Sequence, residues 1–465
     1  MRIRRLLPLV CLLHLIPVII AQDAPSNLVV AHFMVGNTYP YTVDDWTQDF
    51  QLAASKGIDA FALNIGRDPW EPDRIADAFK AMAMIMAQPN SPLLPTPSFR
   101  LFLSFDMSSL PCGSPSDADT IRSLIRAYAV HPAYLLFQGR PVLSTFGGEY
   151  CNFGTGSLDA GWASVIRNGV LNGVGGPMGG KEVVFLPAFF IDPGVVGGLA
   201  ADGAFSWNSA WPMGNYPIDA QDTDAMYLGN LTGKIYMAGV SPWFFTHYGP
   251  STYNKNWIYR SEDHLLSRRF QALITNRARI PIAQIITWND YGESHYIGPV
   301  KGAQPGSQAW VDGFDHQGWL DMIQHYIYAF KYGVYPTIEK DRLFIWGRLF
   351  PASADAPSDP IGRPDHHDWA MDRFEILLHL TAPADLSISC GPSNTGGSFP
   401  AGISKLSLDV SQNAMTAIDS CQVTTLLMRN GQTVINYVPA GMQWKRQVEG
   451  GKGYNFNAFV GASPA

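Results

Sequence analysis

The segment IITWNDYGESHYIG, residues 285–298, joins an apolar strand to an acidic and aromatic turn. Its first four residues, Ile285 to Trp288, are apolar or β-branched, which is typical of a buried strand. Two carboxylates, Asp290 and Glu293, follow directly and lie three residues apart. Binding and catalytic residues are concentrated where strands pass into loops, so this segment predicts both a strand and a functional site.

Similar apolar segments recur along the chain, and segments with helical spacing separate them. Continuous apolar runs predict parallel strands that are covered on both faces. The eight predicted strands are Leu28–Val35, Ala60–Ile65, Arg100–Phe105, Pro141–Phe146, Glu182–Ala188, Gly203–Trp207, Lys234–Val240 and Ala283–Trp288. Eight alternating strands and helices predict an α/β fold of the (β/α)8 TIM-barrel type. A doubly wound open sheet is the alternative, but no glycine-rich phosphate loop follows the first strand.

Capping residues mark several of the intervening helices. Thr42 and Asp45 form a capping box at the start of the first helix. Ser261 is the expected cap of the helix before the eighth strand. A last helix, Trp319–Tyr332, is expected to end at Gly333 and to complete the barrel.

The first 21 residues have the pattern of a secretory signal peptide. Arg2, Arg4 and Arg5 precede the apolar run Leu6–Ile20, and Ala21 is a small residue suited to cleavage. The run is short and contains two prolines, so a membrane anchor is the weaker alternative. We therefore expect a secreted protein, with no membrane span in the mature chain.

The composition and the pattern of apolar residues change after about residue 338. A loop rich in proline, aspartate and serine is followed by alternating segments at short spacing, among them Gln422–Arg429 and Gln432–Val438. The dipeptide Asn430-Gly431 between these two segments is a strong hairpin signal. We predict a signal peptide over residues 1–21, a catalytic barrel over residues 22–338 and an all-β, sandwich-like domain over residues 339–465.

The composition restricts the classes of ligand. The chain of 465 residues is 46% hydrophobic and 15% charged, has a net charge of −7, and contains 13 tryptophans and 19 tyrosines. A nucleic-acid-binding protein needs a basic surface, so we expect no nucleic-acid partner. Abundant aromatic side chains with few charges suit a neutral polar ligand. No feature calls for a cofactor or for more than a monomer.

Four of the five cysteines lie beyond the predicted signal peptide, an even number for an oxidising compartment. They fall into two pairs that lie far from each other in the sequence, which predicts the disulfides Cys112–Cys151 and Cys390–Cys421. Free buried thiols are the alternative. The spacings match no zinc pattern, and no clustered histidines indicate a catalytic metal. Asn230 begins the sequon for N-glycosylation.

The carboxyl ends of the predicted strands gather acids, amides and aromatic residues on one face of the barrel, the face that carries active sites in this fold. Aromatic rings stack on pyranose rings, and amides and carboxylates bind hydroxyl groups, so we predict a sugar site. Asp106 and Asp192 could instead cap the helices that follow them. His32 in the first strand could instead be a core histidine. The candidate substrate-binding residues are His32, Asn64, Asp106, Asp192, Trp207, Asn208, Trp211, His247, Trp288 and Tyr291.

Two carboxylic groups can divide the work of breaking a glycosidic bond. One is protonated and gives its proton to the leaving oxygen, and the other is ionised and activates water or attacks. Burial of one acid beside another raises its pKa and separates the two roles. Asp290 and Glu293 supply such a pair from one loop. The alternative is a pair of acids on a solvated loop without a catalytic role.

Four segments together carry a resemblance: HFMVGNTY at 32–39, GIDAFALNIG at 57–66, FLSFDMSS at 102–109 and ITWNDYGESHYIGP at 286–299. They resemble glycoside hydrolase family 71, the fungal α-1,3-glucanases also called mutanases. The resemblance implies a secreted, endo-acting enzyme that hydrolyses α-1,3-glucan (mutan) with inversion of configuration, outside the cell or in the cell wall. The family's catalytic pair lies in the WNDYGES motif, which matches Asp290 and Glu293 here.

We assign Glu293 as the general acid and Asp290 as the general base. Inversion requires the two carboxyl groups to lie about 6.5–9.5 Å apart, so that a water fits between base and sugar. Two alternatives stay open at this point. One is a hydrolase of another α-glycan, and the other is a cell-wall glucan-binding protein that has lost turnover.

Overall fold

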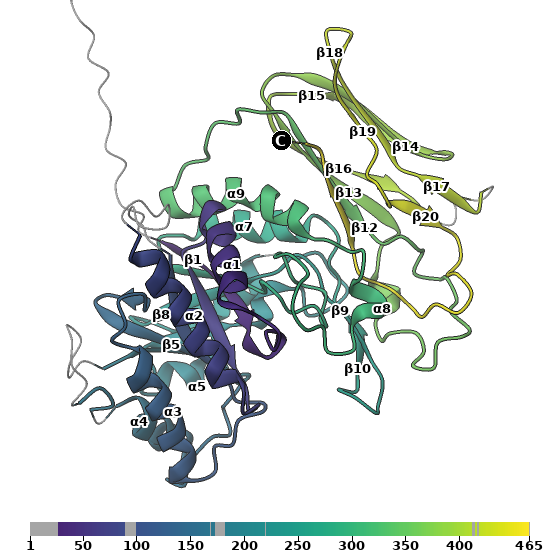
Figure 1. The fold of residues 1–465 in the computed structure, drawn as a ribbon. Coiled ribbons are helices and arrows are strands. Elements are labelled where there is room, and N and C mark those ends of the chain that lie inside the picture. The colour runs from purple at the N-terminus through teal and green to yellow at the C-terminus, as the bar shows by residue number, and fades with distance from the viewer. Residues whose placement is uncertain are drawn as a thin grey trace, which may run out of the picture.

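The computed structural model describes residues 27–88, 99–167, 169–172, 182–218, 220–411, 414–415 and 418–464. An α/β part precedes a β-rich C-terminal part that stands to one side of it (Figure 1). The predicted signal peptide, residues 1–21, lies outside the described residues. Within the described ranges, every helix is too short or too polar to cross a lipid bilayer.

A curled sheet of parallel strands forms the centre of the α/β part. Seven ladders join eight parallel strands in the order β6-β5-β3-β2-β1-β11-β8-β7. Each of the eight overlaps a predicted strand, because each is a continuous buried run, but the last ends at Ile285 and not at the predicted Trp288. The strands are β1 (Leu28–Met34), β2 (Ala60–Ile65), β3 (Arg100–Asp106), β5 (Arg140–Phe146), β6 (Val184–Ala188), β7 (Gly203–Ser206), β8 (Ile235–Val240) and β11 (Ile282–Ile285).

The two edges of this sheet, β6 and β7, lie side by side without a ladder between them. Asp202, just before β7, connects them instead. Its amide nitrogen donates to the carbonyl oxygen of Phe185 at 3.1 Å, and its carboxylate accepts from the Phe185 amide at 2.9 Å. Arg140 and Arg167 neutralise the same carboxylate. The sheet is therefore curled until its edges meet, and the half-buried Asp202 links them.

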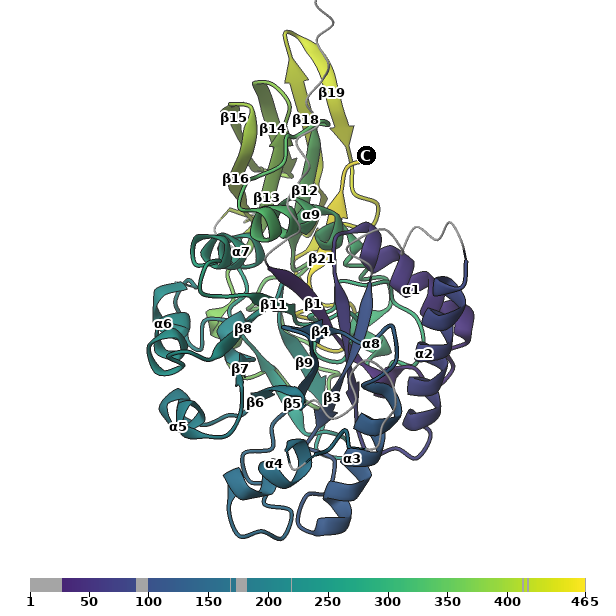
Figure 2. The ribbon, with the colours of Figure 1, turned by 90° about the vertical axis from the view of Figure 1, so that its left-hand side faces the viewer.

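Helices cover the outside of the curled sheet (Figure 2). They are α1 (Val43–Ser55), α2 (Glu71–Met86), α3 (Pro115–Tyr128), α4 (Leu158–Ile166), α5 (Pro193–Gly198), α6 (Ala220–Asn230), α7 (Leu265–Thr275) and α9 (Gln317–Tyr332), with a short α8 (Gln308–Val311). The predicted capping box is present, because Thr42 and Asp45 bond each other's backbone amides. Helix α9 ends as predicted at Gly333, whose φ of 79° a side chain would disfavour.

The prediction that Ser261 caps the helix before the last strand is wrong. Helix α7 begins at Leu265, and its N-cap is His264 in the left-handed conformation. The Ser261 hydroxyl instead accepts from the amide nitrogen of Phe244 at 3.1 Å. A serine near a helix start bonds whichever orphan amide lies within reach, and here that amide belongs to the neighbouring loop.

The C-terminal part consists of antiparallel strands in two four-stranded sheets, ordered β16-β13-β12-β21 and β15-β14-β18-β19, and a small β17-β20 pair. Buried side chains from both large sheets form one shared hydrophobic cluster. The predicted hairpin is present, and Asn430 and Gly431 both have positive φ. The strands are β12 (Arg342–Gly347), β13 (Arg373–Leu380), β14 (Ala384–Cys390), β15 (Ser393–Phe399), β16 (Gly402–Asp409), β17 (Ser420–Gln422), β18 (Thr424–Arg429), β19 (Gln432–Tyr437), β20 (Gln443–Lys445) and β21 (Phe459–Ala462).

Strand β12 belongs to two cores at once. Successive side chains of a strand point to opposite faces. Leu343 and Ile345 lie in the cluster between the C-terminal sheets, whereas Phe344 and Trp346 lie in the large core of the α/β part. The ring of Trp346 contacts that of Trp319 on α9 with centroids 6.3 Å apart. The two parts therefore share a continuous apolar boundary.

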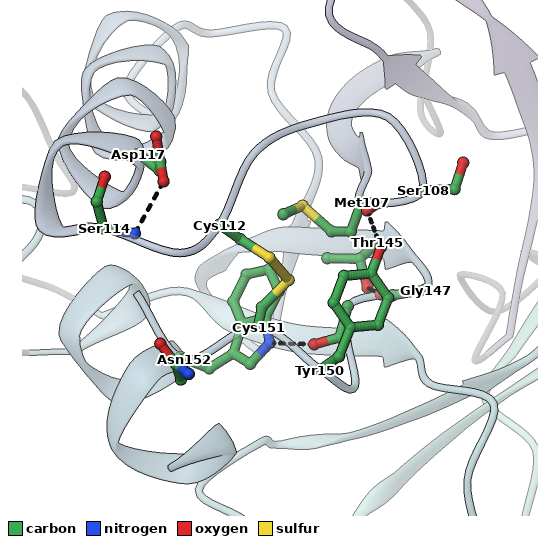
Figure 3. The surroundings of a disulfide bond; sticks show 12 residues. Met107, Ser108, Cys112, Ser114, Asp117, Thr145, Gly147, Tyr150, Cys151 and Asn152 are labelled. Atoms are coloured by element: carbon green, nitrogen blue, oxygen red, sulfur yellow. Dashed lines mark hydrogen bonds between the residues drawn. A yellow bond between two sulfur atoms is a disulfide. The ribbon is translucent and has the colours of Figure 1, made fainter. Parts of the chain in front are cut away.

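Both predicted disulfides are present. Cys112–Cys151 ties the loop after β3 to the loop after β5, and Tyr150 lies beside it (Figure 3). The Tyr150 hydroxyl donates to the carbonyl oxygen of Met107, which fixes the tyrosine between the two loops. Asn230, the predicted glycosylation residue, is the exposed last residue of α6.

Candidate active site

The turn after β11 is fixed to the end of β1 by one side-chain amide. The Oδ1 atom of Asn289 accepts from the Met34 amide at 2.7 Å, and its Nδ2 donates to the Met34 carbonyl oxygen at 3.0 Å. Asn37 donates in turn to the carbonyl oxygen of Asn289 at 2.8 Å. These bonds continue the pairing of β1 with β11 and hold Asp290 at the carboxyl end of the sheet.

The same turn folds back on itself after Glu293. Thr287 donates from its amide to the carbonyl oxygen of His295 at 2.8 Å, and its hydroxyl accepts from the amide of Asp290. The backbone of Glu293 accepts from the Phe245 amide at 3.1 Å. Asp290, Glu293 and His295 are thus held on one compact turn.

The two acids line an open cleft of about 500 Å³. Its walls are the loops after β1, β2, β3 and β11, and the hairpin of β9 (Phe245–Tyr248) and β10 (Lys255–Ile258). Five acids share the cleft, together with amide, hydroxyl and tyrosine side chains. The main side chains are Asn37, Asn64, Asp68, Glu71, Asp106, Ser108, Tyr248, Tyr253, Lys255, Asp290 and Glu293.

Glu293 is held as a carboxylate by two basic neighbours. Its Oε1 atom lies 2.7 Å from Nζ of Lys255, and its Oε2 atom lies 3.1 Å from Nε2 of His295. Burial opposes ionisation, but the attraction and hydrogen bonds of Lys255 and His295 outweigh it and lower the pKa of Glu293 to about 2. At any pH above mildly acidic, Glu293 therefore carries a negative charge.

Asp290 is shifted in the opposite direction. Burial and the negative charge of Glu293 raise the pKa of Asp290 to about 6, against the weaker effects of His295 and Lys255. Its Oδ1 atom accepts from the Glu293 amide at 3.3 Å, and its Oδ2 atom lies 3.8 Å from Nε2 of His295. The pair can therefore hold one proton on Asp290 while Glu293 stays ionised.

The two carboxyl groups approach each other closely at one pair of atoms. One oxygen of Asp290 and one oxygen of Glu293 lie within 4.8 Å of each other, whereas the range of about 6.5–9.5 Å expected for inversion describes the separation of the carboxyl groups as a whole. The Nε2 atom of the buried His295 faces both acids, 3.1 Å from Oε2 of Glu293 and 3.8 Å from Oδ2 of Asp290.

Asp290, Glu293 and His295 are also the described residues whose spacing could suit a metal ion. Their surroundings do not fit one. The ammonium group of Lys255 already bonds Glu293 and would repel a divalent cation at this point.

Two of the predicted substrate-binding residues line the cleft beside the acids, Asn64 and Asp106. The Oδ1 atom of Asn64 accepts from the Ser104 hydroxyl at 3.4 Å. Asp106 accepts from the amide of Ser108 at 3.0 Å, and burial raises its pKa. Both can offer oxygen atoms to sugar hydroxyls.

Five other candidates lie beneath the cleft and do not line it. Trp207 is edge-on to His32, with ring centroids 5.0 Å apart, and His295 packs against Trp207 and Trp211. Burial, together with the charge of His295, lowers the pKa of His32 to about 3, so this ring is neutral. The buried candidates are His32, Trp207, Trp211, Trp288 and Tyr291. Of these, Trp207 and Trp211 pack against the ring of His295 and restrict its orientation.

The last three candidates lie outside the lining of the cleft. Asp192 is the exposed N-cap of α5, where it accepts from the Gly194 amide at 2.7 Å. Asn208 is half-buried in the short helical turn Asn208–Ala210. His247 is buried in β9 between Asn256 and Asp359.

Sequence reasoning missed several residues that line the cleft or contact the acid pair. His295 lies in the quoted segment two residues after Glu293, so its position was a usable signal. Lys255 and Tyr253 belong to a hairpin inserted between β8 and α7, which the strand–helix repeat does not predict. Glu71 is the first residue of α2 and has the pattern of a helix N-terminal acid, yet burial raises its pKa to about 7.

An acid pair with separated protonation states, set in an open cleft, is an arrangement that glycoside hydrolases use. The chain belongs to glycosyl hydrolase family 71, which it matches over residues 25–465. It is 36% identical to the glucan endo-1,3-alpha-glucosidase agn1 of Schizosaccharomyces pombe, with 94% of each chain covered. It is 32% identical to a mutanase of Penicillium rubens, covering 98% of this chain and 95% of the relative.

The ascus wall endo-1,3-alpha-glucanase of Schizosaccharomyces pombe is 30% identical, covering 93% of this chain and 96% of the relative. The GH99 endo-alpha-mannosidase of Bacteroides thetaiotaomicron superposes with a TM-score of 0.47 at 11% identity, covering 66% of this chain and 98% of the other.

Proposed function

We propose that this protein is an endo-acting hydrolase that cuts α-1,3-glucosidic bonds in α-1,3-glucan. Membership of family 71 supports the reaction class, and the names of three relatives that align over at least 93% of the chain support the substrate. The observation that carries the proposal is the pair of Asp290 and Glu293, with opposite pKa shifts in one open cleft.

The electrostatics favours the reverse of the roles that we assigned from the sequence. A general acid must hold its proton until the leaving oxygen takes it, and a general base must be ionised. Asp290, with its raised pKa, suits the acid, and Glu293, bonded to Lys255, suits the base. We therefore propose Asp290 as the general acid and Glu293 as the general base.

In the proposed step Glu293 takes a proton from water as the water oxygen attacks the anomeric carbon. The bond between that carbon and the glycosidic oxygen breaks, and Asp290 gives its proton to the leaving oxygen. Glu293 ends protonated and Asp290 ends ionised, and exchange with solvent restores both. Inversion requires the sugar and the attacking water to fit between the two carboxyl groups.

The finer organisation of the chain is part of the same proposal. We propose that residues 22–338 form a catalytic (β/α)8 barrel, closed where β6 and β7 meet. Residues 339–465 would then form a separate, sandwich-like β domain that covers one side of it. The predicted signal peptide over residues 1–21 and the two disulfides support secretion to the cell exterior or the cell wall, and we propose that the protein acts there as a monomer.

A substrate panel tests the proposal. The purified protein is incubated with insoluble α-1,3-glucan, α-1,4-glucan and α-mannan, and the soluble products are sized by chromatography. We expect release of a range of short oligosaccharides from α-1,3-glucan alone, since an endo-acting enzyme cuts within the chain. Release from α-mannan in preference would reassign the substrate. Binding to α-1,3-glucan without any release would overturn the enzymatic proposal.

A further inference from the structure

The hairpin that carries Lys255 is secured by a segment from the C-terminal half of the chain. Residues 359–365, between β12 and β13, run beside β10. The Ile258 amide donates to the carbonyl oxygen of Asp365 at 3.1 Å, and the Asp365 amide donates to that of Asn256 at 3.0 Å. This segment thus pairs with the outer edge of the hairpin, in the place of a third strand.

A buried carboxylate in this segment bonds the hairpin through a histidine. The Oδ2 atom of Asp359 lies 2.7 Å from Nε2 of His247 on β9, and the Asp359 side chain is only 1% exposed. The same oxygen accepts from the Tyr454 amide at 2.6 Å, and Oδ1 accepts from the Ile361 amide at 2.8 Å. Burial opposes ionisation, but these bonds outweigh it and lower the pKa of Asp359. An acid whose ionised form these bonds favour therefore fixes His247.

His247 passes this restraint to β10. Its Nδ1 atom lies 2.7 Å from Oδ1 of Asn256, and the Nδ2 atom of Asn256 donates to the carbonyl oxygen of Gly362 at 3.2 Å. Asn256 is therefore held from two sides. Neighbouring residues of a strand point to opposite faces, so fixing Asn256 directs Lys255 away from the segment and toward the cleft. There Nζ of Lys255 bonds Oε1 of Glu293 at 2.7 Å.

We propose that Asp359 is a positioning residue for the acid pair: through His247 and Asn256 it holds β10 so that Lys255 stays bonded to Glu293. The proposal deepens the proposed function and rests on it for the meaning of the acid pair. It also assigns the C-terminal half of the chain a part in the site, because Asp359 and Tyr454 both lie beyond residue 338.

Asp359→Asn tests this chain of contacts, because asparagine keeps the size of the side chain and loses its charge. Without the Asp359 contact, Lys255 is bonded to Glu293 for a smaller fraction of the time. The pKa of Glu293 then rises toward its ordinary value. We expect the acidic limb of the pH profile of kcat/KM to move upward by about one pH unit. Lys255→Met should move it at least as far. The double variant should move it no further than Lys255→Met alone, because both changes break the same contact.

Asp372→Asn is the matched control. Asp372 also joins parts of the C-terminal half, bonding Arg348 at 2.9 Å and the Ala352 amide at 2.8 Å, but makes no described bond to the hairpin. It should lower the midpoint of thermal unfolding without moving the acidic limb. An unmoved limb in Asp359→Asn, or a double variant whose shift is the sum of the two single shifts, would overturn the proposal.

A carbon NMR titration of the Glu293 carboxyl group separates this inference from the proposed function. It reports the contact with Lys255 even when the substrate has been wrongly identified. The Asp359→Asn variant should show a raised Glu293 titration midpoint, and an unchanged midpoint contradicts the positioning role whatever the activity. If Asp359→Asn does not fold, His247→Gln breaks the same chain of contacts and carries the same two outcomes.

Discussion

Replacing Asp290 by asparagine should stabilise the protein at neutral pH while it removes activity. Burial and the charge of Glu293 raise the pKa of Asp290 from 3.8 to about 6. The folded state therefore binds this proton more tightly than the unfolded chain does, and ionising the group above pH 6 opposes folding. Below pH 3.8 both states keep the proton, so the effect disappears.

The size of the effect follows from the shift. One pKa unit corresponds to about 1.4 kcal/mol, so the shift of Asp290 sets a ceiling of about 3 kcal/mol on the stabilisation by Asp290→Asn. Glu293→Gln should act in the opposite direction. The pKa of Glu293 is lowered from 4.5 to about 2, so its charge favours folding above pH 4.5, and this contribution is lost as the pH falls through about 2. Removing it should destabilise the protein at neutral pH by up to about 3 kcal/mol.

Thermal unfolding of the wild type and both variants at about pH 7.5 and about pH 3.5 measures these signs. We expect the midpoint of Asp290→Asn to lie a few degrees above that of the wild type at the higher pH, and the difference to shrink at the lower pH. Glu293→Gln should unfold below the wild type at the higher pH. A lower midpoint for Asp290→Asn at neutral pH, or an equal gain at both pH values, would refute the electrostatic reasoning.

Three further outcomes are expected. Lys255→Met should move both limbs of the pH–activity profile upward, because Lys255 lowers the pKa of both acids, whereas Lys255→Arg should not. Tyr253 lines the cleft with 58% of its surface exposed and its ring braced on Tyr248, so Tyr253→Ala should raise KM for α-1,3-glucan about threefold to tenfold with kcat unchanged in steady-state assays. Changing Cys112 and Cys151 to serine should lower the free energy of unfolding in urea by about 4 kcal/mol, through the entropy of the loop they close.

The curled sheet could be predicted because each of its strands is recognisable from its own sequence. Each strand is covered on both faces and is therefore a continuous apolar run, such as Ala60–Ile65, whose predicted bounds match the structure. The acid pair could be placed because it follows the last of these runs directly. The hairpin of β9 and β10 could not be predicted, since it is an insertion that breaks the strand–helix repeat.

The aromatic residues show that a position at the end of a strand is not enough to predict contact with the substrate. A position at the end of a strand places the Cα atom near the cleft but does not set the direction of the side chain. Trp207, Trp211 and Trp288 therefore lie beneath the floor, packed around His295 and the core, although their positions predicted contact with sugar. The exposed tyrosine of the cleft, Tyr253, comes instead from the inserted hairpin.

Proton NMR of the reaction on α-1,3-glucan, run with the wild type, Asp290→Asn and Glu293→Gln side by side, tests the central claim most directly. The wild type should release oligosaccharides whose newly formed reducing ends first appear as the β-anomer, because a water activated by Glu293 attacks opposite the bond that Asp290 protonates. Both variants should remain folded and lose nearly all turnover. Wild-type turnover in either variant would contradict the assignment of the pair, and an α-anomer formed first would contradict the role of Glu293 as a base acting on water.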